Sequence, residues 1–143
     1  MKSQIRFMLL TIALLFNSFV SILTVDTVSY DMLIGSYTKE GNPGIEIFGM
    51  DPRSGKPLAD YTLNSPNASF LAASNDRKFL YSVREEGGSS ASVVVFKSGF
   101  DGKFNVLNSV PNPGNGPCHI VYREESKTVY TANYGSGSLC VYK

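Results

Sequence analysis

Two stretches of the chain that lie 49 residues apart decide the fold: "FLAASNDRKFLYSVRE" at residues 70–85 and "HIVYREESKTVYTANY" at residues 119–134. When the first is laid on the second, Tyr81 meets Tyr130, and the aromatic, β-branched and polar positions agree along both stretches. Similarity within one chain at a fixed spacing is typical of a structural repeat, in which each copy is one packing unit. The sequence therefore predicts at least two copies of the same unit.

A weaker copy lies upstream, where "LIGSYT" at residues 33–38 falls on "LYSVRE" at residues 80–85 with a shift of 47. The segments in between keep a similar period, at Phe48 and Phe96 and at the turn sequences "SGK" and "DGK". Repeats of about 40 to 50 residues with four short strands and Gly- and Asp-rich turns are typical of β-propellers. Each unit is then one propeller blade.

The β-branched and aromatic runs between the turn clusters predict the strands. In the best-defined blade we expect strands at residues 69–73, 79–83, 91–96 and 104–110, and the next blade begins at His119 and continues at 129–132 and 138–142. No convincing amphipathic helix follows residue 30.

The predicted fold class is all-β, a β-propeller with about two to two and a half four-stranded blades. A propeller needs roughly four to eight blades to close, and an open stack exposes apolar faces and strand edges to water. We therefore expect the chain either to be the N-terminal portion of a longer ring or to self-associate.

Residues 1–25 combine the short basic stretch "MKSQIRF" with the apolar run "MLLTIALLF", which is the build of an export signal. The run from Phe7 to Val25 is nearly long enough to span a bilayer and no A-x-A cleavage pattern follows it, so a retained membrane anchor stays open beside a cleaved signal peptide. The rest of the chain is predicted to be secreted or periplasmic, and to meet a membrane only if this segment is retained.

The charge balance, 13 Lys and Arg against 12 Asp and Glu without any block of like charge, argues against nucleic acid as a partner. Cys118 and Cys140 are predicted on non-neighbouring strands, too far apart to form a disulfide, and are expected as free and mostly buried thiols. One His and two Cys at this spacing fit no zinc pattern, so no metal or cofactor is predicted.

Several motifs together are distinctive: "IGSYT" at Ile34, "IEIFGMDPRSGKP" at Ile45, "NASFLAASNDRKFLYSVRE" at Asn67 and "GNGPCHIVYREESKTVYTANYGSGSLCVY" at Gly114. They resemble the lactonase family of seven-bladed propellers, typified by bacterial 6-phosphogluconolactonase. The resemblance implies that residues 32–143 form the N-terminal part of a presumed seven-bladed ring. Because the family is similar in fold to a fungal muconate-lactonising enzyme, the direction of the lactone chemistry stays open. Arg84 departs from the family, which usually has Asn there.

The first strand of each propeller blade lines the central channel, so His119, directly after a Gly-Pro turn, is predicted at the channel mouth. Lactone hydrolysis needs a base and a group that holds the developing oxyanion. We assign His119 as the base, Arg84 to the oxyanion and Glu85 to orient or replace the base, with Asn133 and Tyr134 as substrate contacts. A structural His119, a solvated Arg84–Glu85 ion pair and a turn-forming Asn133 are the alternatives.

The sequence thus predicts an exported lactonase-like hydrolase that opens a sugar lactone, a small-molecule substrate. A non-catalytic ligand- or protein-binding propeller and an inactive fragment are the alternatives, because fold does not dictate activity. "NAS" at Asn67 also fits an N-glycosylation sequon, which matters only in a eukaryotic secretory route.

Overall fold

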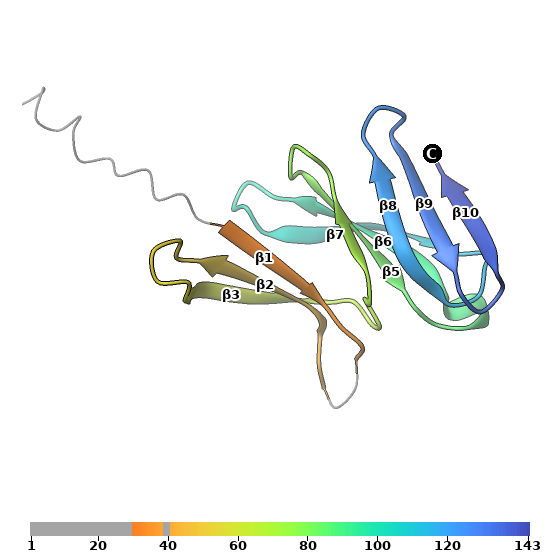
Figure 1. Cartoon of the computed structure of the whole chain (residues 1–143), viewed down its shortest axis with the longest axis horizontal. Coiled ribbons are helices and arrows are strands. Elements are labelled where there is room, and N and C mark those ends of the chain that lie inside the picture. Colours follow the sequence, from red (N-terminus) through yellow and green to blue (C-terminus); the bar gives the residue numbers. More distant parts are fainter. Residues whose placement is uncertain (1–29, 39–40) are drawn as a thin grey trace, which may run out of the picture.

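A computed structural model describes residues 30–38 and 41–143 as three antiparallel sheets placed side by side (Figure 1). The first sheet has the order β1 (Tyr30–Gly35), β2 (Gly44–Met50), β3 (Pro57–Asn64). The middle sheet has the order β4 (Leu71–Ala73), β5 (Phe79–Arg84), β6 (Ser92–Ser98), β7 (Phe104–Pro111), and a 3-10 turn, η1 (Gly88–Ser90), lies between β5 and β6. The last sheet has the order β8 (Pro117–Arg123), β9 (Thr128–Asn133), β10 (Ser138–Tyr142).

The prediction of an all-β partial propeller is confirmed, and most strand positions agree with the sequence pattern. The predicted strand at 138–142 has the observed bounds, and β8 begins at Pro117 rather than at His119. β4 begins at Leu71, two residues later than expected, although Val83 N–H still donates to the Phe70 carbonyl at 3.2 Å ahead of it.

The predicted signal or anchor at residues 1–25 lies outside the described residues. Within the described residues, no helix is long and apolar enough to cross a membrane.

The turns repeat as the sequence predicted. Gly55 joins β2 to β3 with φ +66°, and Gly102 joins β6 to β7 with φ +77°, a left-handed backbone that glycine adopts without a Cβ penalty. In each turn the residue before the glycine accepts from the N–H of the lysine after it, Ser54 Oγ from Lys56 at 3.4 Å and Asp101 Oδ1 from Lys103 at 3.1 Å. The "SGK" and "DGK" sequences are therefore equivalent hairpin turns.

The middle sheet is the centre of the core because both of its faces are covered. Toward the first sheet it presents Leu80 and Phe96, which pack with Ile45 and Ile47. Toward the last sheet its second face buries a separate cluster with members on β5, β6, β8 and β9: Tyr81, Val83, Val93, Ile120 and Val129. Since successive strand residues point to opposite faces, β5 must be apolar at nearly every position to fill both interfaces. This explains the sequence "FLYSVR".

The repeat between the first and middle sheets has a shift of 48 rather than the predicted 47. Leu33 pairs with Ile47 on β2 and packs in the cluster between the first and middle sheets. Leu80 packs in the same cluster, but from the face of the middle sheet that is turned toward the first sheet. On the first sheet Leu33 faces the following sheet, and on the middle sheet the residue that faces the following sheet is Tyr81. A one-residue slip moves every side chain of a strand to the opposite face of the sheet. The alignment of Leu33 with Leu80 therefore matched residues that lie on opposite faces.

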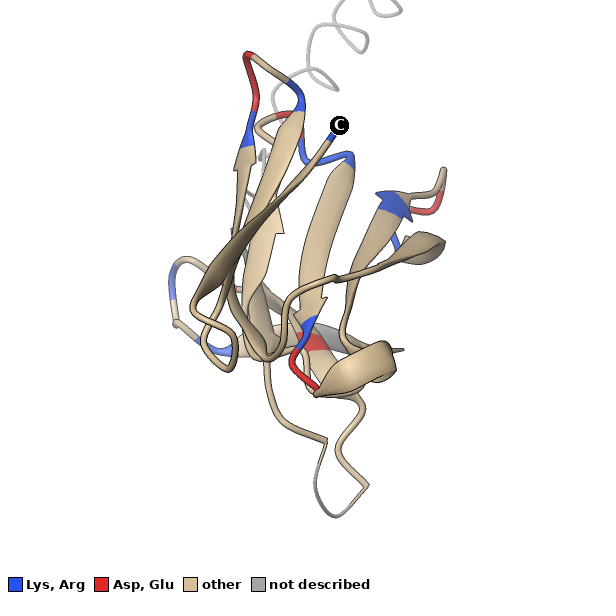
Figure 2. Cartoon of the chain, turned by 90° about the vertical axis from the view of Figure 1, so that its right-hand side faces the viewer, with Lys and Arg blue, Asp and Glu red and all other residues tan. Residues whose placement is uncertain are grey.

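Charged residues gather in the turns at the two ends of the sheets, and the strands between carry few of them (Figure 2). Cys118 lies on β8 and Cys140 on β10, with β9 between them, and both are free thiols as predicted. The expectation that they are mostly buried is wrong, because each lies on an outer strand of the last sheet and is only half-buried.

Candidate functional site

Loops from all three sheets meet at the end of the molecule where β5 finishes and β8 begins. Glu85 N–H donates to the carbonyl of Asn67, ahead of β4, and Gly116 N–H donates to the carbonyl of Glu86. Tyr134 N–H, directly after β9, then donates to the carbonyl of Gly116. These backbone bonds of 2.9 to 3.1 Å join the loops into one rim, which we call the loop rim.

Asn67 attaches the first sheet to this rim. Its Oδ1 accepts from both the N–H and the hydroxyl of Thr38, each at 3.1 Å, and its Nδ2 donates to Glu86 Oε1 at 3.2 Å. With φ +50°, Asn67 occupies the left-handed region that asparagine tolerates better than most residues. A glycan on Nδ2, as the sequon would allow, would replace one of the two hydrogens of the amide that donates to Glu86.

Glu85 is oriented by two hydroxyl donors from segments ahead of it in the chain. Its Oε2 accepts from the Tyr37 hydroxyl at 3.0 Å and from the Ser69 hydroxyl. The hydrogen bond to Glu85 raises the pKa of Tyr37 above its ordinary value, so the phenol stays protonated and keeps donating. Both donors reach the same oxygen, and within the described residues Oε1 has no hydrogen-bond partner. Glu85 is therefore a half-buried side chain with one carboxylate oxygen held by two hydroxyls and the other left for a ligand.

Arg84 pairs with Glu86 and not with Glu85. The Nε of Arg84 lies 3.2 Å from Glu86 Oε1, but the buried Nε–H is not aligned for a hydrogen bond. The Arg84–Glu85 ion pair, one of the alternatives from the sequence, is not formed and Arg84 pairs with Glu86 instead, because adjacent residues at a strand end point to opposite sides. The contact uses Nε alone among the guanidinium nitrogens, and the side chain is 38% exposed.

His119 is exposed on β8 and packs against the ring of Phe70. The two ring centroids are 4.2 Å apart, with the planes tilted by 47°. Phe70 occupies the same repeat position 49 residues earlier, so the contact joins equivalent places in neighbouring sheets. The pairing of β8 with β9 is irregular between Pro117 and His119, directly after Gly116 at φ +61°. In the described part of the chain the imidazole makes no hydrogen bond.

The predicted catalytic residues converge only in part. Ser69 bonds to Glu85, and its neighbour Phe70 packs on His119, so the segment ahead of β4 lies between the carboxylate and the imidazole. Among residues 30–38 and 41–143, no hydrogen bond or ion pair joins His119 to Arg84 or Glu85. The contact between the imidazole and the carboxylate is thus indirect.

Asn133 lies beneath the loop that leads to His119. It is 3% exposed; its Oδ1 accepts from Asn112 at 2.8 Å, and its Nδ2 is 3.2 Å from both the Ser138 hydroxyl and the Cys140 sulfur. A Cβ added to Gly114 would lie 2.1 Å from Nδ2, so the loop packs directly on this amide. Tyr134, in contrast, is 87% exposed beside the loop rim. Asn133 fixes the loop, and Tyr134 is open to a ligand.

The sequence reasoning missed Tyr37, Ser69 and Phe70. A shift of 48 would have revealed Tyr37, because it then aligns with Glu85, which aligns with Tyr134 in the next sheet. Tyr37, Glu85 and Tyr134 come within two residues of the ends of β1, β5 and β9, so they belong to the same end of the molecule. Of the described residues, no three His, Cys, Asp or Glu side chains form a group that could hold a metal ion.

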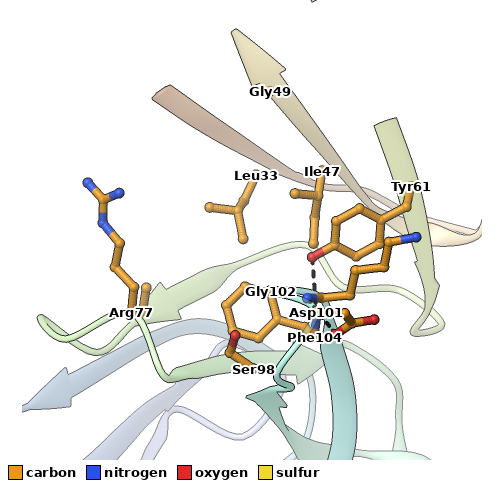
Figure 3. A pocket seen from close by; sticks show the side chains of 11 residues that line it. Leu33, Ile47, Gly49, Tyr61, Arg77, Ser98, Asp101, Gly102 and Phe104 are labelled. Atoms are coloured by element: carbon orange, nitrogen blue, oxygen red, sulfur yellow. Dashed lines mark hydrogen bonds between the residues drawn. The ribbon is translucent and has the colours of Figure 1, made fainter. Parts of the chain in front are cut away.

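A cavity of about 590 Å³ lies between the first and middle sheets at the opposite end of β5 (Figure 3). Leu33 and Ile47 point into it from the first sheet, and Tyr61 accepts a hydrogen bond of 3.2 Å from the N–H of Phe104 across it. Arg77, Asp101 and Lys103 supply its charged side chains. Its lining includes none of the predicted site residues and no His or Cys, so the loop rim is the better candidate for acid–base chemistry.

Comparison with known proteins identifies the family to which this chain is similar. Residues 31–143 match a family model described as a lactonase with a seven-bladed β-propeller. The 6-phosphogluconolactonase of Bacillus subtilis is 30% identical over 111 residues, which cover 76% of this chain and 32% of that protein. An uncharacterized protein of Staphylococcus epidermidis is 32% identical over 111 residues, covering 77% of this chain and 32% of its own length.

Among solved structures, one from Bacteroides fragilis, provisionally assigned as a 6-phosphogluconolactonase, matches with a TM-score of 0.70 at 35% identity. The match covers 82% of this chain and 33% of that structure. The periplasmic gluconolactonase of Pseudomonas aeruginosa has the same fold, with a TM-score of 0.70 at 22% identity. The chain thus spans about a third of the length of the relatives that it matches.

Proposed function

The chain belongs to the lactonase family of seven-bladed β-propellers, and on that basis we propose that its loop rim contributes to a site that opens a sugar lactone by hydrolysis. The observation that carries the proposal is the Glu85 carboxylate, held by the hydroxyls of Tyr37 and Ser69, with the exposed imidazole of His119 on the other side of the Ser69–Phe70 segment. A fixed carboxylate and an accessible imidazole are the groups that general base catalysis uses.

In the proposed reaction a water molecule adds to the lactone carbonyl carbon while a base takes one of its protons. The ring C–O bond then breaks, and the proton passes to the departing ring oxygen, which leaves a hydroxy acid. His119 is the first candidate for the base because an imidazole titrates near neutral pH, and Oε1 of Glu85 is the second. The outer nitrogens of the Arg84 guanidinium are the candidate donors to the oxyanion.

Tyr134 is the candidate substrate contact, since its hydroxyl is exposed at the same rim. Asn133 would act through the position of the loop that carries His119, because its amide is already bonded inside the protein. We propose these roles in place of the direct substrate contact that the sequence suggested for Asn133.

The proposed substrate is a sugar lactone of the aldonolactone type. If residues 1–25 direct export, the site lies outside the cytoplasm, and phosphorylated sugar lactones are cytoplasmic metabolites. Within this proposal an unphosphorylated lactone is therefore favoured over the 6-phosphogluconolactone that names the Bacillus subtilis relative.

The test is lactone opening by the full chain, with glucono-δ-lactone and 6-phosphoglucono-δ-lactone as substrates and acid release followed by a pH indicator. We expect His119→Ala and Glu85→Gln to lower kcat/KM by roughly a hundredfold or more if each acts as a base. The matched control is Glu125→Gln, which removes a carboxylate that is 78% exposed and paired only with Arg123. Tyr37→Phe should give a smaller loss, because Ser69 still holds the carboxylate.

The pH dependence of kcat/KM separates the two candidate bases. The variant that removes the acting base should lose the pH-dependent rise in kcat/KM that the wild type shows, and the other variant should keep it. Equal activity of the wild type and both variants, or no rate above spontaneous hydrolysis, would contradict the proposed function.

A non-catalytic binding platform is the second candidate, and one observation favours it. Catalytic imidazoles are commonly oriented by a hydrogen bond from the second ring nitrogen, and His119 has none within the described residues. In that case the chain should bind the lactone or its hydroxy acid without turnover, and His119→Ala should leave most of the affinity, as isothermal titration calorimetry can measure.

A further inference from the structure

The cavity between the first and middle sheets has an apolar interior and room for a small organic molecule (Figure 3). Its volume is about 590 Å³, within the range of about 300–1,000 Å³ that small-molecule sites in proteins have. Leu33 and Ile47 line it from the first sheet, and Phe104 lines it from the middle sheet. The same three side chains pack in the cluster between these sheets. The packing of two sheets that are in direct contact therefore holds the walls of the cavity in place.

Tyr61 joins the two walls on one side of the cavity. Its hydroxyl accepts the 3.2 Å hydrogen bond from the N–H of Phe104, which links β3 to β7. The Nζ of Lys103 lies 5.6 Å from the centroid of the Tyr61 ring, a distance at which the ring face attracts the ammonium group. The carboxylate of Asp101 accepts from the N–H of Lys103 at 3.1 Å. Lys103 and Asp101 thus each have a partner inside the protein.

Arg77 lies across the cavity from Tyr61, with Leu33 and Ile47 between them (Figure 3). The ion pairs among the described residues do not include its guanidinium, and no described side chain accepts a hydrogen bond from it. The side chain is exposed in the turn between β4 and β5, where the backbone has φ +57°. A guanidinium always carries its positive charge and can bind a carboxylate through two parallel hydrogen bonds. Arg77 therefore offers an unused anion-binding group at the edge of an apolar cavity.

We propose that this cavity binds a small organic carboxylate with an aromatic body. The body lies among the apolar side chains of the lining, and the carboxylate accepts hydrogen bonds from the guanidinium of Arg77. The rings of Tyr61 and Phe104 favour an aromatic body, because ring pairs gain stability beyond the area that they bury. The charge favours an anion, since the described lining has two cations, Arg77 and Lys103, against the single carboxylate of Asp101.

The proposal does not depend on the proposed lactone chemistry, because the described lining shares no residue with the loop rim and lies at the opposite end of β5. The experiment is isothermal titration calorimetry of the full chain with phenylbutyrate, and with phenylbutanol as a neutral ligand that has the same carbon skeleton. We expect the wild type to bind the carboxylate roughly tenfold or more tightly than the alcohol, because only the carboxylate can pair with the guanidinium.

Three variants separate the charge of the site from its shape. Arg77→Gln should weaken phenylbutyrate by roughly tenfold or more and leave phenylbutanol unchanged. Ala73→Leu should weaken both ligands, because Ala73 is an exposed lining residue whose enlargement narrows the cavity. The matched control is Lys78→Gln, which removes the neighbouring cation, one that pairs with Asp76 at 3.4 Å and is not part of this lining. It should bind both ligands like the wild type. Far-UV circular dichroism checks that each variant is folded.

Methyl NMR spectra of the wild type locate the ligand without any substitution. Phenylbutyrate should shift the methyl signals of Leu33 and Ile47 and leave Ile120, in the other sheet interface, unchanged. The proposal is overturned by a wild type that does not bind phenylbutyrate at millimolar concentration, or by shifts that lie outside the cavity. It is also overturned if the acid and the alcohol bind equally, or if Arg77→Gln binds the acid like the wild type, since the cavity would then take apolar molecules without selecting an anion.

Discussion

At the scale of single residues, three equivalent positions explain how a repeated unit yields a site that is not repeated. Tyr37 lies two residues after the end of β1, and Glu85 and Tyr134 directly follow β5 and β9. The repeated backbone brings each to the same end of its sheet, and the different side chains then supply a hydroxyl donor, a carboxylate and an exposed phenol. The Tyr37–Glu85 hydrogen bond of 3.0 Å is a contact between neighbouring repeats.

Tyr81 provides a prediction at this scale. Burial raises the pKa of its phenol from 10.0 to about 12, with the nearby Tyr122 ring, 4.7 Å away, adding to the effect. The folded state therefore holds the proton more tightly than the unfolded state does. Stability from this group is complete below pH 10 and falls as the pH rises toward about 12, by at most about 3 kcal/mol.

We expect Tyr81→Phe to reduce this alkaline loss of stability, because the ring remains and the ionisable group is gone. The measurement is the free energy of unfolding from urea titrations at neutral and alkaline pH. Tyr134→Phe is the control, since that side chain is 87% exposed. If the two variants showed the same alkaline loss as the wild type, burial of Tyr81 would not be its cause.

The sequence identified some of these residues and could not identify others. Glu85 and His119 follow recognisable strand and turn patterns, so their placement at one end was predictable. Tyr37 was hidden by the shift of 47, which aligned it with Arg84 instead of Glu85. The burial of Asn133 depends on Asn112, 21 residues away, and no local pattern distinguishes that hydrogen bond from a turn.

At the scale of the elements, β5 shows why strands were easier to predict than their register. Its six residues are apolar apart from Ser82 and Arg84, and the strand was predicted to within one residue at its end. Which neighbour each side chain meets depends on even and odd positions, and a one-residue error inverts them. The first sheet could be aligned with the middle sheet only once the side chains packed at both sheet interfaces were known.

Phe96 on β6 tests the interface between the first and middle sheets. It is fully buried among Ile45, Ile47 and Leu80, so Phe96→Ala should lower the free energy of unfolding by about 3–5 kcal/mol through lost burial and a remaining cavity. Phe100→Ala, in the turn after β6 and fully exposed, should change it by less than about 0.5 kcal/mol. Urea unfolding measures both, and similar losses would contradict the assigned packing.

At the scale of the whole molecule, the three sheets form a stack in which each contacts its neighbour. The cluster between the first and middle sheets and the cluster between the middle and last sheets have no residue in common. The open stack with exposed apolar faces was predictable from the number of repeats alone. Stability in such arrays is approximately a sum of units and nearest-neighbour interfaces.

Ile47 and Ile120 allow this separation to be measured with the same substitution on the two sides. Ile47 is 5% exposed in the first cluster and Ile120 is 1% exposed in the second. Each change to Ala should cost about 2–5 kcal/mol at its own interface. Because the interfaces are separate, we expect Ile47→Ala to accelerate amide hydrogen exchange by roughly tenfold or more in β1–β3 and to leave β8–β10 close to wild type. Ile120→Ala should do the reverse. Equal acceleration of all three sheets in both variants would show that the stack opens only as one cooperative unit, and the nearest-neighbour description would then be wrong.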